Sequence, residues 1–143
     1  MLYNYLIKLF ILLLFLSCEA PAETITVEEL SIVVEDVVGL DFVREPRDRL
    51  YKLIDKETFV AFLDQDDTDK LTYIIDWRDC DDFAKIFLAR VIEWMPGLPI
   101  GIANIDNGTH VVNVFVDSDL QVWFVDAQHD RVYEAYEASF IYM

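Results

Sequence analysis

The chain has 143 residues and a mass of 16.7 kDa, which is room for one domain of ordinary size. Its hydrophobic share of 55%, with 10 Phe, 7 Tyr and 3 Trp, supplies enough apolar surface to exclude a disordered chain. The 27 acidic against 11 basic residues leave a formal charge of −16, which argues against nucleic acid as a partner and against adsorption to anionic lipid headgroups. Two cysteines are too few for a disulfide framework, so the fold depends on its apolar core.

The N-terminal segment has the pattern of a secretory leader. A short polar start with one cation, Lys8, precedes an unbroken apolar run from Leu9 to Leu16. This run is well short of the ~20 residues that a membrane-spanning helix needs, so it fits the apolar region of a signal peptide. It ends at Ser17 and Cys18, and the string Phe-Leu-Ser-Cys resembles a bacterial lipobox, in which the cysteine becomes the lipid-modified N-terminus.

This leader divides the chain into three predicted parts. We expect a lipoprotein-type signal peptide over residues 1–17, a short tether over residues 18–25 and one domain over residues 26–143. Lipidation of Cys18 would hold that domain on the cell envelope, anchored to the membrane outside the cytoplasm. An ordinary signal peptide, with Cys18 unmodified or removed, is the alternative.

Helical spacing of apolar residues predicts the first half of the domain. Thr26 and Glu29 have capping-box spacing, which predicts a helix over about residues 27–38, although the β-branched content also allows a strand. Asp55 is placed to cap a second helix, whose apolar face is formed by Phe59, Phe62 and Leu63. Residues 80–93 form the strongest helical pattern, since acids occupy the first turn and Pro96-Gly97 ends it.

Between the second and third helices lies an acidic loop, Asp64 to Lys70. Its carboxylates are spaced like those of a calcium loop, but an EF-hand needs Gly at the sixth position and Glu at the twelfth, where this chain has Asp69 and Ile75. A solvated acidic turn is therefore the main interpretation, and incidental calcium is the alternative. The calcium ligands would be Asp64, Asp66, Asp67 and Asp69. No other metal or cofactor is expected.

From Leu98 the apolar period changes to two, which predicts antiparallel strands. The expected strands are Ile100–Ile105, His110–Val116, Gln121–Val125 and, at about residues 139–142, a last one. Asn107-Gly108 is a strong signal for a two-residue type I′ hairpin turn. Helices followed by strands predict an α+β domain in which helices pack on an antiparallel β-meander.

One cysteine and one histidine are placed for nucleophilic chemistry. Cys80 opens the strongest helix, where the helix dipole and free amide donors favour a thiolate. His110 begins a strand, whereas His129 lies in what reads as a solvated turn, so His110 is the better base. A hairpin centred near Ser118 would pair His110 with Asp126. This arithmetic predicts a Cys80 nucleophile, a His110 base and an Asp126 that orients the imidazole.

The same register predicts the surroundings of this site. It places Val112 opposite Phe124 and Val114 opposite Val122, on the sheet face that supports the Cys80 helix. Polar or aromatic residues that could support the site are Asn113, Gln128 and Trp77, with Gln128 as an oxyanion donor. Trp77 also fits simple packing at the rim of the core.

Three strings in this region carry a resemblance to a known family. They are Trp77–Ala84, Gly108–Asn113 and Phe124–Gln128. Together they resemble the papain-like cysteine peptidase domain at the C-terminal end of Marasmius agglutinin and in related bacterial and phage proteins, over about residues 50–130. The resemblance implies a papain-like fold and the Cys-His-acid order of transglutaminase-like proteins. In place of the family's Gly-His-Ala and Glu-Pro, this chain has Thr-His-Val and Asp-Ala.

The functional expectation combines the leader with this resemblance. It is an extracytoplasmic, lipid-anchored cysteine hydrolase that cleaves peptide or isopeptide bonds with Cys80, His110 and Asp126. Its partners would be a peptide or cell-wall peptide substrate and the membrane that holds its lipid anchor. The alternative is a catalytically inactive papain-like lipoprotein that serves as a binding or exclusion module at the cell surface.

Overall fold

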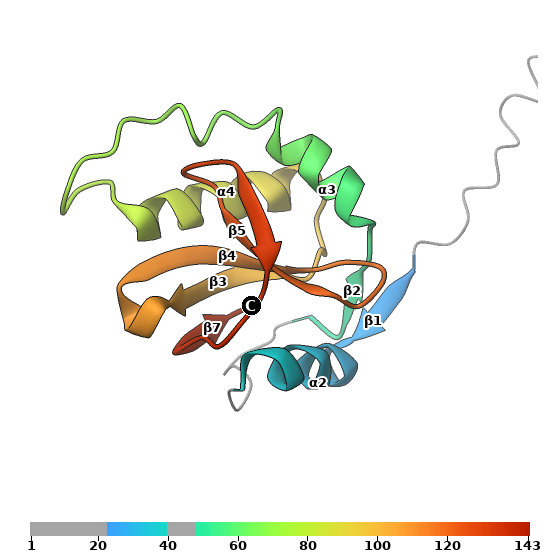
Figure 1. The fold of residues 1–143 in the computed structure, drawn as a ribbon. Helices are drawn as coiled ribbons and strands as arrows, with labels where there is room; N and C mark the ends of the chain where they lie inside the picture. The colour runs from blue at the N-terminus through green and yellow to red at the C-terminus, as the bar shows by residue number, and fades with distance from the viewer. Residues whose placement is uncertain (1–22, 40–47) are drawn as a thin grey trace, which may run out of the picture.

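A five-stranded antiparallel sheet divides the molecule, and helices cover both of its faces (Figure 1). This computed structural model describes residues 23–39 and 48–143. The predicted signal peptide, Cys18 and most of the predicted tether lie outside the described residues. Within those residues, no helix is long and apolar enough to cross a membrane.

The first helix is confirmed, and it begins on a short strand. Strand β1 (Thr24–Thr26) pairs with β2 (Leu50–Lys52), so the last residues assigned to a tether belong to the folded domain. Helix α2 (Val27–Val38) has the predicted capping box, because the Glu29 amide donates to the Thr26 hydroxyl at 3.3 Å and the Thr26 amide donates to the Glu29 carboxylate at 3.0 Å.

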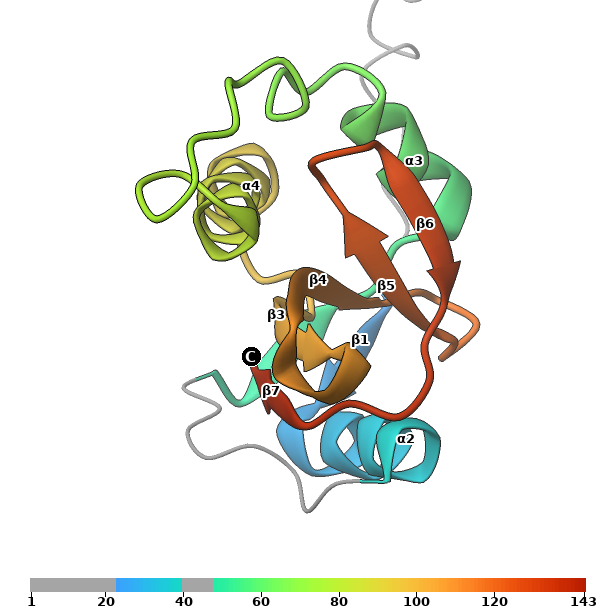
Figure 2. The same cartoon turned by 60° about the vertical axis from the view of Figure 1, so that its left-hand side comes forward.

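Two more helices lie together on the opposite face of the sheet (Figure 2). Helix α3 (Lys56–Leu63) is capped by Asp55, whose carboxylate accepts the Thr58 amide at 2.7 Å. Helix α4 (Cys80–Trp94) follows the acidic loop. Both predicted helices are confirmed, with α4 one residue longer than expected.

The large sheet has the order β6-β5-β4-β3-β7. Its strands are β3 (Ile100–Ile105), β4 (His110–Val116), β5 (Val122–Asp126), β6 (Arg131–Glu134) and β7 (Phe140–Tyr142). Strand β6 was not predicted, because it is short and half polar. The meander is also incomplete, because β7 crosses back to pair with β3 instead of β6.

The connection between β3 and β4 differs from the predicted two-residue turn. Ile105 pairs with His110, so four residues join the strands, and the short helix η1 (Asp106–Gly108) lies among them. Three of these residues have positive φ, which Asn107 and Gly108 adopt easily. The Asn-Gly signal thus marks the hairpin correctly but does not determine the length of its loop.

The β4–β5 hairpin is centred one residue later than predicted. Val114 pairs with Phe124 and Val116 with Val122, which puts the centre at Asp119. Each residue of β4 therefore faces a partner two positions further along β5 than expected. A shift of two keeps the alternation of faces, so the even-numbered residues still share one side of the sheet.

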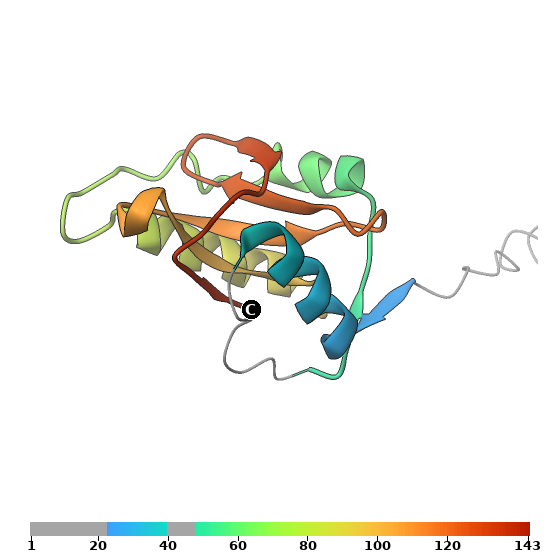
Figure 3. The same cartoon turned by 60° about the horizontal axis from the view of Figure 1, so that its bottom comes forward.

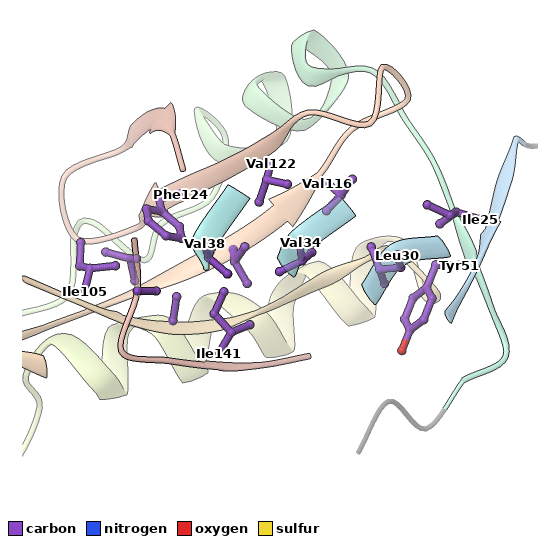
Figure 4. Close-up of a cluster of buried hydrophobic side chains, with 14 of the residues drawn as sticks. Ile25, Leu30, Val34, Val38, Tyr51, Ile105, Val116, Val122, Phe124 and Ile141 are labelled. Carbon is purple, nitrogen blue, oxygen red and sulfur yellow. The ribbon is translucent and has the colours of Figure 1, made fainter. Parts of the chain in front are cut away.

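That side, however, does not support α4. The even-numbered valines and Phe124 pack with Leu30, Val34 and Val38 of α2 in one core cluster (Figure 4). A second cluster joins α3 and α4 to the other face through residues such as Phe59, Phe87 and Phe115. Figure 3 shows α2 on its own side of the sheet. The prediction that the even-numbered residues of β4 and β5 pack against the Cys80 helix is thus wrong. The odd-numbered side of β4, which includes Phe115, packs against that helix instead.

Candidate functional site

Cys80 is a partly buried free cysteine at the first position of α4. Around it, Asp79, Asp81 and Asp82 hold carboxylate oxygens within 4.8 Å of one another. A hydrogen bond with Asp81 raises the pKa of Asp79, and hydrogen bonds from Asp79 and Lys85 lower the pKa of Asp81. The thiol therefore lies in an acidic surface patch that Lys85 partly neutralises.

Two histidines converge on the nearly buried Asp126. One carboxylate oxygen of Asp126 lies 2.9 Å from His129 Nδ1 and 3.4 Å from His110 Nε2. Its other oxygen accepts the Gln128 amide at 3.1 Å. Sequence reasoning placed His129 in a solvated turn, but an acid three residues before a histidine in a tight turn was the signal for this contact.

The structure joins two of the three predicted catalytic residues. His110 meets Asp126 across a diagonal of the β4–β5 hairpin instead of as a direct cross-strand pair. Within residues 23–39 and 48–143, no hydrogen bond links the Cys80 sulfur to His110. The joint action of Cys80, His110 and Asp126 stays a prediction.

The predicted supporting residues have different environments. Asn113 is completely buried, and its amide donates to the carbonyls of Ala84 at 2.9 Å and Gly101 at 3.1 Å, which ties α4 to the sheet. Trp77 is 83% exposed in the loop before α4. Gln128 contacts Asp126 through its backbone. Asn113 thus holds the fold together, and Trp77 packs neither in the core nor at its rim.

The acidic loop is partly neutralised by cations of the chain itself. Asp66 pairs with Arg90 at 3.0 Å, and Asp67 pairs with Lys70. Of the remaining groups, Asp69 Oδ1 and Thr68 Oγ1 are buried without a hydrogen-bond partner among the described residues. Because two of the four predicted ligands already have cationic partners, a calcium ion here would have to displace them. Calcium binding stays a prediction.

A groove lies between α3 and α4, at a place that was not predicted from the sequence. This groove has a volume of about 830 Å³. It is lined by Thr58, Ala61, Phe62, Gln65, Asp66, Asp67, Arg90, Glu93 and Trp94. Its lining comes from α3, from the start of the acidic loop and from the last turns of α4. No periodic signal in the sequence marked this groove, because its aromatic residues and carboxylates come from these separate segments.

The groove combines an aromatic wall with polar groups. The rings of Phe62 and Trp94 stack with their centroids 4.2 Å apart and their planes 10° from parallel. Beside them Arg90 Nη1 donates to Asp66 Oδ2, whose side chain is only 7% exposed. An aromatic wall next to carboxylate, amide and guanidinium groups can bind a small molecule that has one apolar face and polar edges.

Comparison with known proteins identifies the fold. No family model and no curated protein matches the chain. Among solved structures, the chain resembles one described as "PSL1a-E64 complex", with a TM-score of 0.72, 20% identity and coverage of 84% of this chain and 50% of that chain. It also resembles Polyporus squamosus lectin bound to the epitope Neu5Aca2-6Galb1-4GlcNAc, with a TM-score of 0.68, 20% identity and coverage of 84% and 49%. At this identity the likeness shows a shared fold, and the chain spans about half the length of each structure.

These neighbours correct the predicted family and fold. Both are structures of a lectin, so they contradict a papain-like peptidase and its catalytic-helix arrangement. The observed fold is a small domain with a five-stranded antiparallel sheet and few helices. The strings behind the resemblance also have packing roles here: Phe83, Ala84 and Ala127 are buried, and Asn113 binds backbone carbonyls. Packing alone can therefore account for these residues at these positions.

The functional expectations that rested on that family are corrected with it. A cysteine hydrolase with a peptide or cell-wall peptide substrate does not agree with neighbours that are sugar-binding lectins. The comparisons also give no support to a lipoprotein signal peptide or a membrane partner. A binding module, the alternative that the sequence left open, agrees better with these neighbours. The location on the cell envelope stays a prediction, because Cys18 lies outside the described residues.

Proposed function

We propose that this domain is a carbohydrate-binding module and that the groove between α3 and α4 is its binding site. The observation that carries the proposal is the composition of the groove, where the stacked Phe62 and Trp94 stand beside Gln65, Arg90 and Glu93. The lectin neighbours support it, because one of them is bound to a sialylated oligosaccharide.

The chemistry of a sugar matches this lining. A pyranose ring has an apolar face of C–H groups, which packs on aromatic rings, and a rim of hydroxyl groups. Planar side chains such as carboxylates, amides and guanidinium groups bind pairs of adjacent hydroxyls. A volume of about 830 Å³ is within the range of small-ligand sites and can hold a short oligosaccharide.

Calorimetric titration with a panel of oligosaccharides tests this proposal. We expect Trp94→Ala to weaken binding about tenfold or more, because an aromatic anchor in a pocket contributes strongly to affinity. Trp77→Ala is the matched control, since Trp77 is exposed outside the groove. Trp94→Phe and Gln65→Ala keep the test valid if Trp94→Ala unfolds the domain. A wild-type protein that binds no oligosaccharide, or a Trp94→Phe and Gln65→Ala pair with unchanged affinity, would contradict the proposal.

A further inference from the structure

The residues that line the groove carry more negative than positive charges. Asp66, Asp67 and Glu93 bring three carboxylates, and Arg90 is the one cation among the lining residues that the structure describes. Arg90 is already paired with Asp66 at 3.0 Å, and Asp67 is paired with Lys70. Glu93 is exposed and has no ion-pair partner within the described part of the chain. The groove therefore offers a carboxylate to a ligand but no uncommitted cation.

From this charge distribution we propose that the groove selects glycans that carry a protonated amine and rejects glycans that carry a carboxylate. The inference rests on the proposed carbohydrate function and names the class of sugar. A deacetylated amino sugar would place its ammonium group near Glu93, while its ring packs on Phe62 and Trp94.

Rejection of acidic sugars follows from the Arg90–Asp66 pair. A sialic or uronic acid needs a cation for its carboxylate, and Arg90 is the cation in reach. To bind it, Arg90 would have to release Asp66, which would leave a carboxylate that is only 7% exposed without its partner. Losing this ion pair is unfavourable, since the nearly buried Asp66 carboxylate would keep the Thr68 amide at 2.9 Å but lose its cation. The net charge of −16 adds long-range repulsion.

The expected specificity thus differs from that of the lectin neighbour, which is bound to an epitope that contains Neu5Ac, an acidic sugar. Glu93 and Trp94 lie three and four residues after Arg90, so these three side chains line the groove from α4.

Calorimetry with three tetrasaccharides tests the inference at about pH 6, where sugar amines are protonated. The probes are β1-4-linked glucosamine, its N-acetylated form and galacturonic acid. We expect the glucosamine probe to bind about tenfold more tightly than the acetylated probe, with the preference decreasing as salt is added. Galacturonic acid should bind most weakly.

Glu93→Gln should remove the preference, so that the ratio of the glucosamine affinity to the affinity for the acetylated probe falls to about one. Glu134→Gln, which makes the same charge change on an exposed residue of β6, is the control and should keep the preference. If no tetrasaccharide binds, the proposed carbohydrate function fails and this inference fails with it. If the acetylated probe binds but glucosamine gains nothing, or Glu93→Gln changes nothing, the inference alone is overturned. Tighter binding of galacturonic acid would also overturn it.

Discussion

Several aspartate side chains of this acidic protein are buried or nearly buried, and each has its own hydrogen-bond donors. Asp126 is nearly buried and holds two histidines, while Asp66 is buried against Arg90. Asp117 is buried as well, and it accepts the amides of Asp119 and Gln121 and the indole N–H of Trp123. Because each is supplied with donors, these acids stabilise turns and helix contacts in spite of the chain's high negative charge.

Asp130 is an acid whose position disfavours its charge. Burial raises its pKa first, and the charges of Asp69, Asp64 and Asp66 raise it further. A pKa that is higher in the folded state than in the unfolded state destabilises the folded protein at neutral pH, and the penalty disappears as pH falls below the unfolded value. Asp130 also has a φ of +50°, which asparagine tolerates well.

Asp130→Asn should therefore stabilise the protein at pH 7 by only about 0.5 kcal/mol, because the carboxyl is partly solvated. Urea unfolding at pH 7 and at about pH 3 measures the effect. The electrostatic part of the gain should vanish at the lower pH, whereas a gain from backbone preference should persist. A loss of stability at pH 7 would contradict the raised pKa of Asp130.

The grouping of Cys80 with His110 can be checked without any substrate. If the imidazole assists the thiol, His110→Ala should slow alkylation of Cys80 by iodoacetamide about tenfold. His129→Ala is the matched control, because His129 contacts Asp126 from the turn. Equal rates in the wild type and both variants would show that Cys80 reacts alone.

At the level of elements, one buried side chain connects α4 to the sheet. Asn113 of β4 donates both amide hydrogens, one to the Ala84 carbonyl in α4 and one to the Gly101 carbonyl in β3. Its Oδ1 is buried without a partner in the described chain. A polar residue so placed in a core fixes how far and at what angle the helix lies on the strands.

Asn113→Ala should cost about 2 kcal/mol, because it removes two buried hydrogen bonds and leaves a small cavity. Chemical denaturation measures the loss. Asn113→Asp should cost more at pH 7 than at low pH, since a carboxylate cannot donate to the two carbonyls. If Asn113 supported a ligand site instead of the fold, Asn113→Ala would leave stability unchanged and reduce binding.

At the scale of the whole molecule, the five-stranded sheet is complete only when β7 returns to pair with β3 as its edge strand. Gly101 makes this approach possible, because a Cβ there would lie 2.1 Å from the Tyr142 carbonyl oxygen and 2.6 Å from a side-chain carbon of Met143. Ile141 of β7 is buried in the cluster under α2. The C-terminal strand therefore completes both the sheet and one of the two cores.

Gly101→Ala should displace β7 and destabilise the protein by about 2 kcal/mol, within the usual range for overpacking. Hydrogen exchange should show faster exchange at residues 140–142, while α4 keeps its protection. Gly39→Ala is a useful comparison: it has a φ of +70° and open space around it, so it should cost about 1 kcal/mol through backbone strain alone. Unchanged exchange in β7 would show that Gly101 is not needed for this contact.

Local signals in the sequence were sufficient for the helices and most strands. The capping box of α2, the Asp55 cap and the apolar spacing of α4 are interactions within a few residues, so the sequence shows them directly. The period of two likewise revealed β3, β4 and most of β5. Strand β6 was not predicted, because none of its four residues is fully buried and their burial does not alternate.

Only the tertiary structure decided the register of the β4–β5 hairpin, the sheet face that each helix covers and the position of the groove. A β4–β5 hairpin centred at Asp119 instead of Ser118 follows from the geometry of the loop between the two strands, which the sequence does not specify. Which face supports α4 depends on contacts between residues far apart in the chain, and the sequence pattern of a sheet buried on both faces is the same either way. The groove arises because α3 and α4 are packed side by side across the acidic loop, which brings Phe62 to Trp94 and Asp66 to Arg90. Such long-range neighbours leave no periodic signal, so the site with the strongest case for binding was the one that sequence reasoning did not find.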